Sequence, residues 1–500
     1  MDYQIHFETL GCRLNQIESE SAARFFSDAG FAVHMENISA SAEPDENVLV
    51  CVVNTCTVTT KAEQKARRTI RLLLKKYPKA VLVITGCYAQ VEPEEISKID
   101  SRIAVLPGMN KARLAELPGF LKSYIQKNEF DSAEFATALM QSLFKVENTI
   151  AGSNNSSVPL NVESGQAVAE NPFKLSTDTF LSHSRASLKI QDGCNCQCTY
   201  CRIHIARGKS VSLDAQQVIN RVLELKRAGQ KEVVITTVNI GQYRSVYEGR
   251  RIDFTDLLEL LLEKTSGISF RLSSLYPEIV DERFAEIIKD ERVAPHFHIS
   301  LQSGSDRILK LMKRPYKVEQ VYNAITLLKK AKNNPFIACD IIAGFPGETD
   351  EDFEQTMRLA EWAEFAWIHA FPFSARPGTE AYNMKPKIPQ SVAGKRVESL
   401  LKLACKNKIE YISKLCGTAV TAIAERPFVP KDSKYTDDML TEKTYFRAVT
   451  SNFLHCIVDP CGQEIPCSGA EIRIKIEKVL SDKIADGSEE EAFAKLIRVY

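Results

Sequence analysis

Apolar and polar positions alternate in blocks along the first part of the chain. Short, almost wholly apolar runs are followed by longer segments such as "KAEQKARRTIRLLLKKYPK", in which apolar residues recur at helical spacing. The apolar runs are residues 3–10, 48–55 and 80–86. Buried strands that alternate with helices are typical of an α/β fold with a doubly wound parallel sheet. We expect this first domain to occupy residues 1–130.

The pattern stops and then resumes. Residues 131–185 are expected to form a linker, because their second half is rich in Ser, Asn and Thr and has no periodicity. Strand–helix alternation returns over residues 186–415. The strands expected there are "ASLKIQ", "EVVITTV", "SFRLSSL", "HFHISLQ", "FIACDIIAGF" and "WIHAFPF". A run of βα units of this length predicts a full or partial (β/α) barrel.

The last part of the chain changes character. Four short segments, "TAVTAIAE", "KTYFRAVTSN", "LHCIVDP" and "EIRIKIEKVL", alternate between apolar and polar residues. They predict a small antiparallel β-barrel, similar to an OB-fold, over residues 416–485. We expect residues 486–500 to be a C-terminal tail.

Composition narrows the class of protein. The 500 residues are 44% hydrophobic and 26% charged, which is typical of globular domains. The formal net charge is zero, so a surface that binds nucleic acid must be a local concentration of positive charge. The N-terminus has no signal-peptide pattern and no apolar run is long enough to span a bilayer. We therefore expect a cytoplasmic protein with no membrane partner.

Cysteine usage points to metal or redox chemistry. The chain has 14 cysteines, and disulfides are disfavoured in the cytosol. Cys194, Cys198 and Cys201 have the spacing CxxxCxxC and follow a predicted strand, so they lie where βα folds build active sites. Thiolates are the usual ligands of iron–sulfur clusters, and three ligands on four irons leave one iron open. The alternative is a structural zinc site with three or four cysteines.

Cys196 lies within the same stretch, "CNCQCTYC". Two ligands one residue apart on a tight loop point in different directions, so both are hard to place on one cluster. We therefore expect that Cys196 is not a ligand of the cluster.

The CxxxCxxC motif after the first barrel strand resembles that of the radical S-adenosylmethionine (radical SAM) enzymes. The resemblance implies that the open iron binds the amino and carboxylate groups of SAM. It also implies reductive cleavage of SAM to a 5′-deoxyadenosyl radical.

Three further cysteines each end an apolar run in the first domain. Cys12 lies in "TLGCRLN", Cys56 in "VNTCTVT" and Cys87 in "ITGCYAQ". The carboxyl ends of parallel strands lie side by side, so the three thiols are expected to converge at one edge of the sheet. Helices begin just after them, and their N-terminal dipoles favour thiolates and an anionic cluster. The alternative is three separate core thiols.

A chain with these two cysteine sets resembles the methylthiotransferases. The resemblance covers almost the whole chain. The motifs "LQSGSDRILKLMKRPY", "DIIAGFPGETDEDF" and "FPFSARPGTEAYNM" match that family's barrel. The resemblance implies an auxiliary cluster in the N-terminal domain, a radical SAM barrel and a C-terminal TRAM domain. It implies two [4Fe-4S] clusters and SAM as cofactors. The implied partners are tRNA, a sulfur donor and an electron donor such as flavodoxin or ferredoxin.

The resemblance also implies SAM contacts at the ends of the barrel strands. Ser274, Gln302 and Asp340 are the candidates, and no catalytic side chain is assigned. Two features depart from the family pattern. Many members read "YCIIPYARG" where this chain reads "YCRIHIARG", with Arg202 and His204, and many have Gly in place of Thr237.

Two features bear on the substrate. TRAM domains bind RNA, which makes Tyr445, Phe446 and Phe453 candidates for base stacking, although aromatic residues in strands more often belong to the core. The predicted helix after Cys56 carries seven basic residues. Such a run is usually a solvated face, and beside a cluster it can guide phosphates.

The stretch "TLGCRLNQIESE" is most similar to the branch that acts on threonylcarbamoyladenosine. The resemblance implies that a 2-methylthio group is installed on N6-threonylcarbamoyladenosine next to the anticodon. Other branches act on isopentenyladenosine in tRNA or on a ribosomal-protein aspartate. A protein of another class, a non-catalytic iron–sulfur or zinc RNA-binding protein, is the further alternative.

Overall fold

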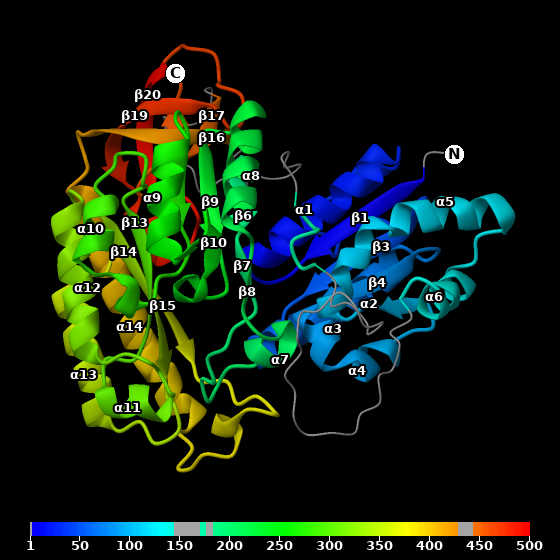
Figure 1. Cartoon of the computed structure of the whole chain (residues 1–500), viewed down its shortest axis with the longest axis horizontal. Helices are drawn as coiled ribbons and strands as arrows, with labels where there is room; N and C mark the ends of the chain where they lie inside the picture. The colour runs from blue at the N-terminus through cyan, green and yellow to red at the C-terminus, as the bar shows by residue number, and fades with distance from the viewer. Residues whose placement is uncertain (1–2, 145–170, 177–183, 429–443) are drawn as a thin grey trace. The chain divides into compact units, whose positions relative to one another are not determined.

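The structure is a computed structural model, and it forms two compact units (Figure 1). It describes residues 3–144, 171–176, 184–428 and 444–500. The first unit is Met1–Thr177 with Arg202–Gly208, and the second is Asp178–Cys201 with Lys209–Tyr500. Most of the Ser- and Asn-rich stretch predicted as a linker lies outside the described residues.

The first unit is built on a five-stranded, wholly parallel sheet with the strand order β2-β1-β3-β4-β5. The strands are β1 (Gln4–Thr9), β2 (Ala32–His34), β3 (Val48–Thr55), β4 (Val81–Gly86) and β5 (Ile103–Val105). The predicted parallel sheet is therefore confirmed, and its three long strands are those expected from the apolar runs. The two outer strands have only three residues each, which is too short for a periodic pattern.

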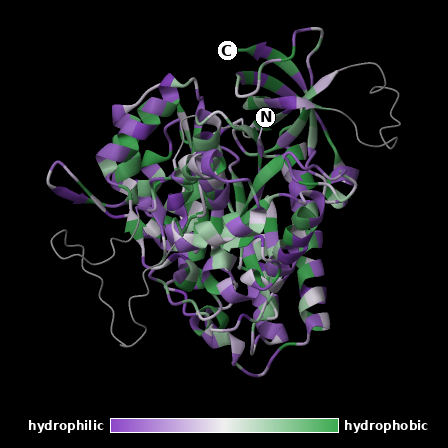
Figure 2. Cartoon of the chain, turned by 90° about the vertical axis from the view of Figure 1, so that its right-hand side faces the viewer, coloured by the Kyte–Doolittle hydropathy of each residue, from purple (hydrophilic) through white to green (hydrophobic). Residues whose placement is uncertain are grey.

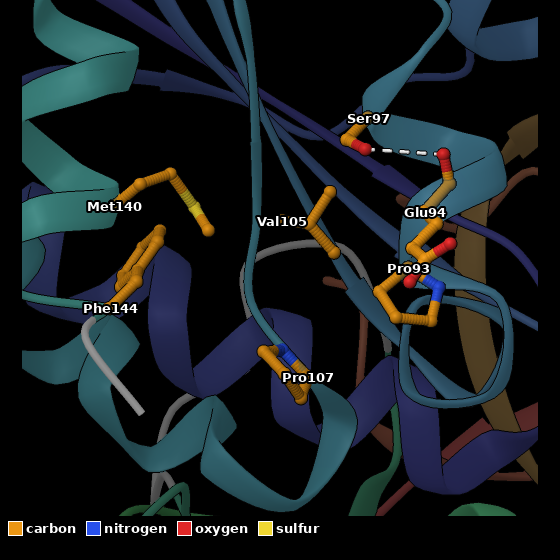
Figure 3. A pocket seen from close by; sticks show the side chains of 7 residues that line it. All are labelled: Pro93, Glu94, Ser97, Val105, Pro107, Met140 and Phe144. Carbon is orange, nitrogen blue, oxygen red and sulfur yellow. Dashed lines mark hydrogen bonds between the residues drawn. The ribbon is translucent and has the colours of Figure 1, made fainter. Parts of the chain in front are cut away.

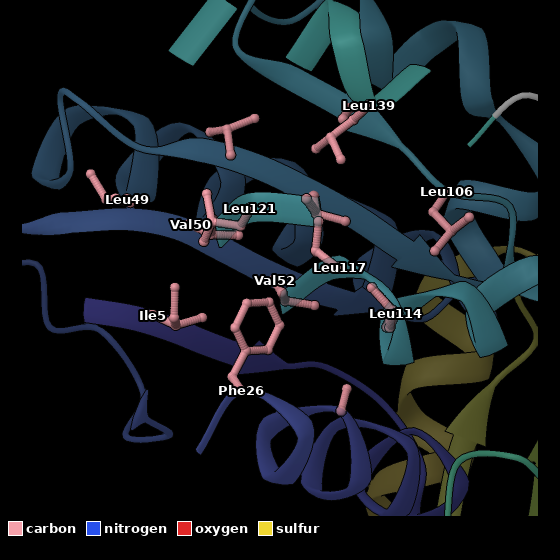
Figure 4. Close-up of a cluster of buried hydrophobic side chains, with 14 of the residues drawn as sticks. Ile5, Phe26, Leu49, Val50, Val52, Leu106, Leu114, Leu117, Leu121 and Leu139 are labelled. Carbon is pink, nitrogen blue, oxygen red and sulfur yellow. The ribbon is translucent and has the colours of Figure 1, made fainter. Parts of the chain in front are cut away.

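Helices cover both faces of this sheet. The helices of the first unit are α1 (Arg13–Asp28), α2 (Thr60–Lys76), α3 (Cys87–Val91), α4 (Pro93–Ser97), η1 (Gly108–Ala115), α5 (Leu117–Lys127), α6 (Ser132–Gln141) and α7 (Ile203–Arg207), of which α7 contacts α3 and η1. Successive strand residues face opposite sides, so Val50 and Val52 join one core cluster while Cys51 and Val53 join the other. Figure 4 shows the first of these clusters, in which strand and helix side chains interdigitate.

The first unit extends past the boundary expected at residue 130. Helix α6 belongs to it, because Phe135 and Leu139 are fully buried in its core. A hollow of about 360 Å³ opens nearby between Pro93, Val105 and Met140, among others (Figure 3). No cysteine lines this hollow.

The second unit begins with six parallel strands in two three-stranded sheets, ordered β12-β9-β6 and β13-β14-β15. Single bridges, Phe270 to Val293 and Leu275 to Ile299, join the two sheets along one edge. The strands are β6 (Ala186–Lys189), β9 (Glu232–Thr236), β12 (Ser269–Leu272), β13 (His296–Gln302), β14 (Phe336–Ala343) and β15 (Trp367–Pro372). The arrangement is a partial (β/α) barrel, and all six predicted strands are present.

Amphipathic helices pack on the outside of this partial barrel. Most helix ribbons of the chain carry both hydrophobic and hydrophilic residues (Figure 2). The helices are α8 (Ala215–Arg227), α9 (Phe254–Lys264), α10 (Glu282–Ile287), α11 (Asp306–Leu311), α12 (Val318–Ala331), α13 (Asp350–Ala363) and α14 (Gln390–Ser413), with short turns η2 (Ile240–Gln242), η3 (Pro277–Ile279) and η4 (Glu380–Tyr382). Two small ribbons complete this part: β7 (Gln191–Asp192) with β8 (Val211–Ser212), and β10 (Ser245–Tyr247) with β11 (Arg250–Ile252).

The C-terminal part is a closed five-stranded barrel with the order β16-β17-β18-β20-β19. Its elements are β16 (Ala419–Phe428), β17 (Tyr445–Thr450), β18 (His455–Asp459), β19 (Glu471–Val479), α15 (Ser481–Ala485) and β20 (Ala492–Val499). The expected antiparallel barrel is mixed, because β18 and β20 are parallel. Residues 486–500 are not a tail, since β20 closes the barrel with the alternating pattern of "AFAKLIRV".

The aromatic candidates for RNA stacking have other roles. Phe446 is buried in the core of the barrel, and Tyr445 is buried in a small cluster with Phe428 and Ile457 on the other face of β17. The half-buried Phe453 lies below the guanidinium groups of Arg185 and Arg271, whose carbons are 5.6 and 5.3 Å from its ring centre. Phe453, Arg185 and Arg271 therefore pack together where the small barrel meets strands β6 and β12.

Among the helices that the structure describes, none combines the length and the apolar character that crossing a bilayer requires.

Candidate iron–sulfur sites

The three cysteines of the first unit lie where the sequence predicts, at the carboxyl ends of neighbouring strands. Cys12 is the N-cap residue of α1, Cys56 directly follows β3, and Cys87 opens α3 after β4. Because β1, β3 and β4 are adjacent in the sheet, the three strand ends lie side by side. The thiols of Cys12 and Cys87 are close enough to act electrostatically on that of Cys56.

Side chains from two elements tie these strand ends together. The Asn15 amide donates to the carbonyls of Leu10 (2.8 Å) and Thr55 (3.1 Å), which precede Cys12 and Cys56. The Thr55 hydroxyl donates to the carbonyl of Thr85 (2.5 Å) at the end of β4. The backbone before each cysteine is thus held in register by hydrogen bonds, which is the rigidity that a multi-ligand site needs.

Glycines at two of the strand ends permit this close approach. A Cβ on Gly11, whose φ is +111°, would lie 2.7 Å from the Cβ of Cys56. A Cβ on Gly86, whose φ is +93°, would lie 2.4 Å from the carbonyl oxygen of Thr55. Both positions therefore require glycine, for conformation and for space.

Buried charges lie beside the three thiols. Glu18 is fully buried and pairs with Lys111 (2.6 Å) and Arg207 (3.2 Å). Arg207 also donates to the Asn15 side chain (2.7 Å), so two cations face one carboxylate behind the cysteines. Burial raises the pKa of Cys56 to about 11 and also raises that of Cys87, while Arg207 lowers both by a smaller amount. Burial is therefore the largest influence on the pKa of these two thiols.

Arg202, one of the two departures from the family pattern, is a buried anchor of the first unit. It follows Cys201 in sequence and precedes α7, and its guanidinium donates to Glu63 (3.3 Å) and Glu92 (2.9 Å). Glu63 also accepts a hydrogen bond from Thr57, the residue next to Cys56. Arg202 therefore fixes α7 against the loop that carries Cys56.

We expect Arg202→Gln to loosen α7 by about 3 kcal/mol, because it leaves a buried carboxylate without its cation. The measurement is amide hydrogen exchange of Ile203–Arg207, which should become faster. The control is Arg24→Gln, since Arg24 pairs with Asp28 on the surface, where an ion pair contributes less than about 1 kcal/mol. Equal exchange in the two variants would show that Arg202 is not an anchor.

The second cysteine set lies on the loop after β7 in the second unit. Cys194 and Cys198 are buried, and Cys196 and Cys201 are half-buried. A backbone hydrogen bond from Cys201 to the carbonyl of Cys198 (3.0 Å) closes a turn between these two residues. Three thiols of the CxxxCxxC motif are therefore presented on one short loop.

A cation that the sequence reasoning did not single out lies beside this loop. Arg314 donates from Nη1 to the sulfur of Cys198 (3.3 Å). Its guanidinium carbon lies 4.5 Å from the ring centre of Tyr276 and 4.9 Å from that of Tyr316. The two rings hold the guanidinium in place through cation–π contacts. Arg314 thus supplies positive charge where an anionic cluster would need it.

Cys196 lies between its neighbours. Hydrogen bonding from its thiol lowers the pKa of Cys194 to about 7 and that of Cys198 to about 6, and raises its own. Its sulfur accepts hydrogen bonds from Gln242 (3.1 Å) and Asn239 (3.6 Å). The side chain is therefore already engaged by polar groups of the η2 turn.

We expect Cys196→Ser to retain both the iron content and the SAM cleavage of the wild-type chain. A hydroxyl can keep the hydrogen bonds to Gln242 and Asn239, and the other three cysteines still supply the thiolates. Iron analysis and the yield of 5′-deoxyadenosine measure the two properties. Loss of iron in this variant would make Cys196 a ligand.

The three candidate SAM contacts lie on neighbouring strands or at their ends. Ser274 and Asp340 meet through His298: Ser274 Oγ is 2.9 Å from Nδ1, and Asp340 Oδ1 is 3.3 Å from Nε2. Gln302 ends β13 with a φ of +65°, a left-handed conformation that is uncommon for a non-glycine residue. The structure links Ser274 and Asp340 through His298, and it pairs Gln302 with Ile341, the neighbour of Asp340 on β14.

Other parts of the predicted rim have structural roles. A Cβ on Gly344 in "GFPGET" would lie 2.4 Å from the Cβ of Ala393, and one on Gly304 in "LQSGS" would lie 2.6 Å from the Cα of Thr356. These glycines allow helices α14 and α13 to pack closely. Thr237, where many family members have Gly, lies 3.2 Å from the hydroxyl of Ser273.

Neither cysteine set is drawn together around a single ion. Over residues 3–144, 171–176, 184–428 and 444–500, no three His, Cys, Asp or Glu side chains are arranged to hold one metal ion. The fit to an iron–sulfur cluster therefore depends on the donor chemistry. Each set offers three thiols beside buried or half-buried cations, which suits a cluster of several irons and net negative charge.

Comparison with known proteins identifies the family. The model of the radical SAM superfamily matches residues 188–360, and that of the uncharacterized protein family UPF0004 matches residues 4–108. The threonylcarbamoyladenosine tRNA methylthiotransferase MtaB of Treponema pallidum is 42% identical over 499 residues, which cover 95% of this chain and 98% of that protein. The chain belongs to the radical SAM threonylcarbamoyladenosine tRNA methylthiotransferases.

Other relatives include a protein of the same name and a protein named for a different modified adenosine. The protein of the same name from Bacillus subtilis is 31% identical and covers 95% of this chain and 94% of its own length. The tRNA-2-methylthio-N(6)-dimethylallyladenosine synthase of Ehrlichia canis is 26% identical, over 90% of this chain and 93% of that protein. Membership of the radical SAM family implies a [4Fe-4S] cluster and SAM as cofactors.

The sequence reasoning missed the cations around both sites. Arg314 stands in the matched motif "LKLMKRPY", and Arg207 in "IARG", so both were visible as residues of family motifs. Lys111 stands in an unremarkable turn, and only the fold shows that it is buried against Glu18.

Proposed function

We propose that this chain replaces the hydrogen at C2 of N6-threonylcarbamoyladenosine, next to the anticodon of tRNA, by a methylthio group. The observation that supports this most is the 42% identity to the Treponema pallidum protein over nearly the full length of both chains. The two cysteine sets agree with it, because insertion of sulfur into an unactivated C–H bond requires radical chemistry and a source of sulfur.

Cys194, Cys198 and Cys201 would hold the [4Fe-4S] cluster that binds SAM, and Cys12, Cys56 and Cys87 would hold an auxiliary [4Fe-4S] cluster. When bound, the first cluster supplies an electron for the cleavage of SAM, and the second carries or delivers the sulfur. A further SAM provides the methyl group. Arg314 offsets negative charge at the first set, and Arg207 and Lys111 do so at the second.

Ser274, Gln302 and Asp340 would contact SAM from the strand ends of the partial barrel. His298 lies between two of them, with its Nδ1 2.9 Å from Ser274 Oγ and its Nε2 3.3 Å from Asp340 Oδ1. The reaction takes place in the cytoplasm, with an electron donor such as flavodoxin or ferredoxin and with a sulfur donor.

The test uses the purified chain after anaerobic reconstitution with iron and sulfide. It receives SAM, a reductant and either tRNA that carries N6-threonylcarbamoyladenosine or tRNA that carries isopentenyladenosine. Methylthiolation of the first tRNA alone is the expected result. Product on the isopentenyladenosine tRNA or on a ribosomal-protein aspartate would assign the chain to another branch. Bound zinc with no SAM cleavage would assign it to a non-catalytic class.

A further inference from the structure

Helix α2 in the first unit is strongly basic. It contains one acidic residue, Glu63, and seven basic residues: Lys61, Lys65, Arg67, Arg68, Arg71, Lys75 and Lys76. Its inner face, with Ala66, Ile70 and Leu73, is buried against the sheet. The chain as a whole has no net charge, so this helix is a local concentration of positive charge.

Two of the seven basic residues, and the one acidic residue, form hydrogen bonds within the first unit. The acidic Glu63 is buried and is bound by Arg202 (3.3 Å). Arg67 donates to the Tyr88 hydroxyl (2.7 Å) and to Glu95 (3.0 Å). Lys76 donates to the carbonyl of Ala42. The only carboxylate on the helix is therefore turned inward and does not offset the outer charges.

The remaining five basic side chains are exposed and lie along one line. They form the α2 basic face: Lys61, Lys65, Arg68, Arg71 and Lys75. Their spacing of four, three, three and four residues keeps them within about a third of the helix circumference and along about 21 Å of its axis. In the part of the chain that the structure describes, no carboxylate pairs with any of the five.

Exposed lysines on another helix behave differently. On α14, Lys402 pairs with Glu398 (2.9 Å) and Lys406 with Glu410 (4.0 Å), each one helical turn away. Interleaved charges of this kind are typical of a solvated face. In a row of cations without such partners, neighbouring positive side chains repel each other. A polyanion bound along the row offsets this repulsion.

The position of the α2 basic face relates it to the auxiliary cysteines. Thr59 caps the helix by accepting a hydrogen bond from the amide of Ala62 (3.1 Å), and Cys56 lies three residues before this cap. Lys61 therefore stands at the end of the helix that is nearer to Cys56, and the row leads away from it toward Lys75. Regularly spaced cations that lead away from a site suit the phosphates of a strand whose base is held at that site.

We propose that the α2 basic face binds the phosphate backbone of the tRNA substrate on the strand that carries the modified adenosine. The inference rests on the proposed function, which provides the tRNA. The face positions the strand and reads no sequence, because phosphate contacts are the same at every nucleotide.

The test compares two triple variants of the full-length, reconstituted chain. The first is Lys65→Gln, Arg68→Gln, Arg71→Gln, and glutamine preserves the helix because its helix propensity is close to that of Lys and Arg. The matched control, Arg227→Gln, Lys310→Gln, Lys330→Gln, removes three exposed charges from the second unit. Binding to tRNA that carries N6-threonylcarbamoyladenosine is measured at several salt concentrations.

The α2 variant is expected to bind tRNA at least about tenfold more weakly near 0.1 M salt, and the slope of log affinity against log salt should fall by about 2 to 3. SAM cleavage in the absence of tRNA and the iron content should equal those of the wild-type chain, as should tRNA binding by the control. Equal affinity of both variants and the wild-type chain would overturn the inference, and so would equal losses in both variants. Unchanged tRNA binding with slower reduction by an acidic electron-donor protein would overturn it too, and would assign the face to that protein.

The outcomes also separate this inference from the proposed function. If the wild-type chain itself binds no tRNA, the proposed function fails and the inference fails with it. If the wild-type chain binds and modifies tRNA and the α2 variant does so equally well, only the inference fails.

Discussion

Replacement of Cys12, Cys56 and Cys87 together by serine is expected to abolish the methylthio product and to leave SAM cleavage intact. The reason is that the two cysteine sets belong to different compact units, each with its own core. The iron content should fall from about eight to about four per chain, since each [4Fe-4S] cluster carries four irons. Iron analysis, 5′-deoxyadenosine yield and nucleoside mass spectrometry measure the three quantities.

The matched control is Cys51→Ala. Cys51 lies on β3, a few residues before Cys56, and is fully buried with its thiol in the apolar core. This variant should keep about eight irons and full product formation, with a small loss of stability from the missing sulfur. Product formation by the triple serine variant at the wild-type rate would show that these cysteines do not serve sulfur insertion.

Replacement of Cys194, Cys198 and Cys201 together by serine is expected to have the reciprocal effect. It should abolish SAM cleavage, and with it the product, while about four irons remain on the N-terminal set. The matched control is Cys339→Ala, because Cys339 on β14 is fully buried and far in sequence from the loop. SAM cleavage that persists in the triple variant would place the radical chemistry elsewhere.

The sequence predicted the long elements well, because each has a clear hydrophobic pattern. Strands β1, β3 and β4 and the six strands of the partial barrel were all expected. It missed β2 and β5, which have three residues each and gain their stability from neighbours in the sheet. It also missed β20. The residues "AFAKLIRV" alternate, but the pairing with β18 and β19 that makes them a strand of the barrel is visible only in the structure.

For the candidate sites too, some features could be predicted from the sequence and others could not. The six candidate cysteines could be selected from the sequence, because their spacing and their positions at the ends of apolar runs are visible there. Their surroundings could not, since Arg207 and Lys111 reach Glu18 from segments far apart in sequence. The basic run of α2 was visible, but only the structure shows that Arg67 and Lys76 are engaged internally while five other cations remain on one face. Long-range pairing of charges leaves no periodic signal.

The central claim is that this chain converts N6-threonylcarbamoyladenosine to its 2-methylthio form. The most direct test is mass analysis of tRNA nucleosides from cells with the gene and from cells in which it is deleted. The account predicts that 2-methylthio-N6-threonylcarbamoyladenosine disappears on deletion, that its unmodified precursor accumulates, and that 2-methylthio-isopentenyladenosine does not change. Unchanged 2-methylthio-N6-threonylcarbamoyladenosine in the deletion cells would contradict it.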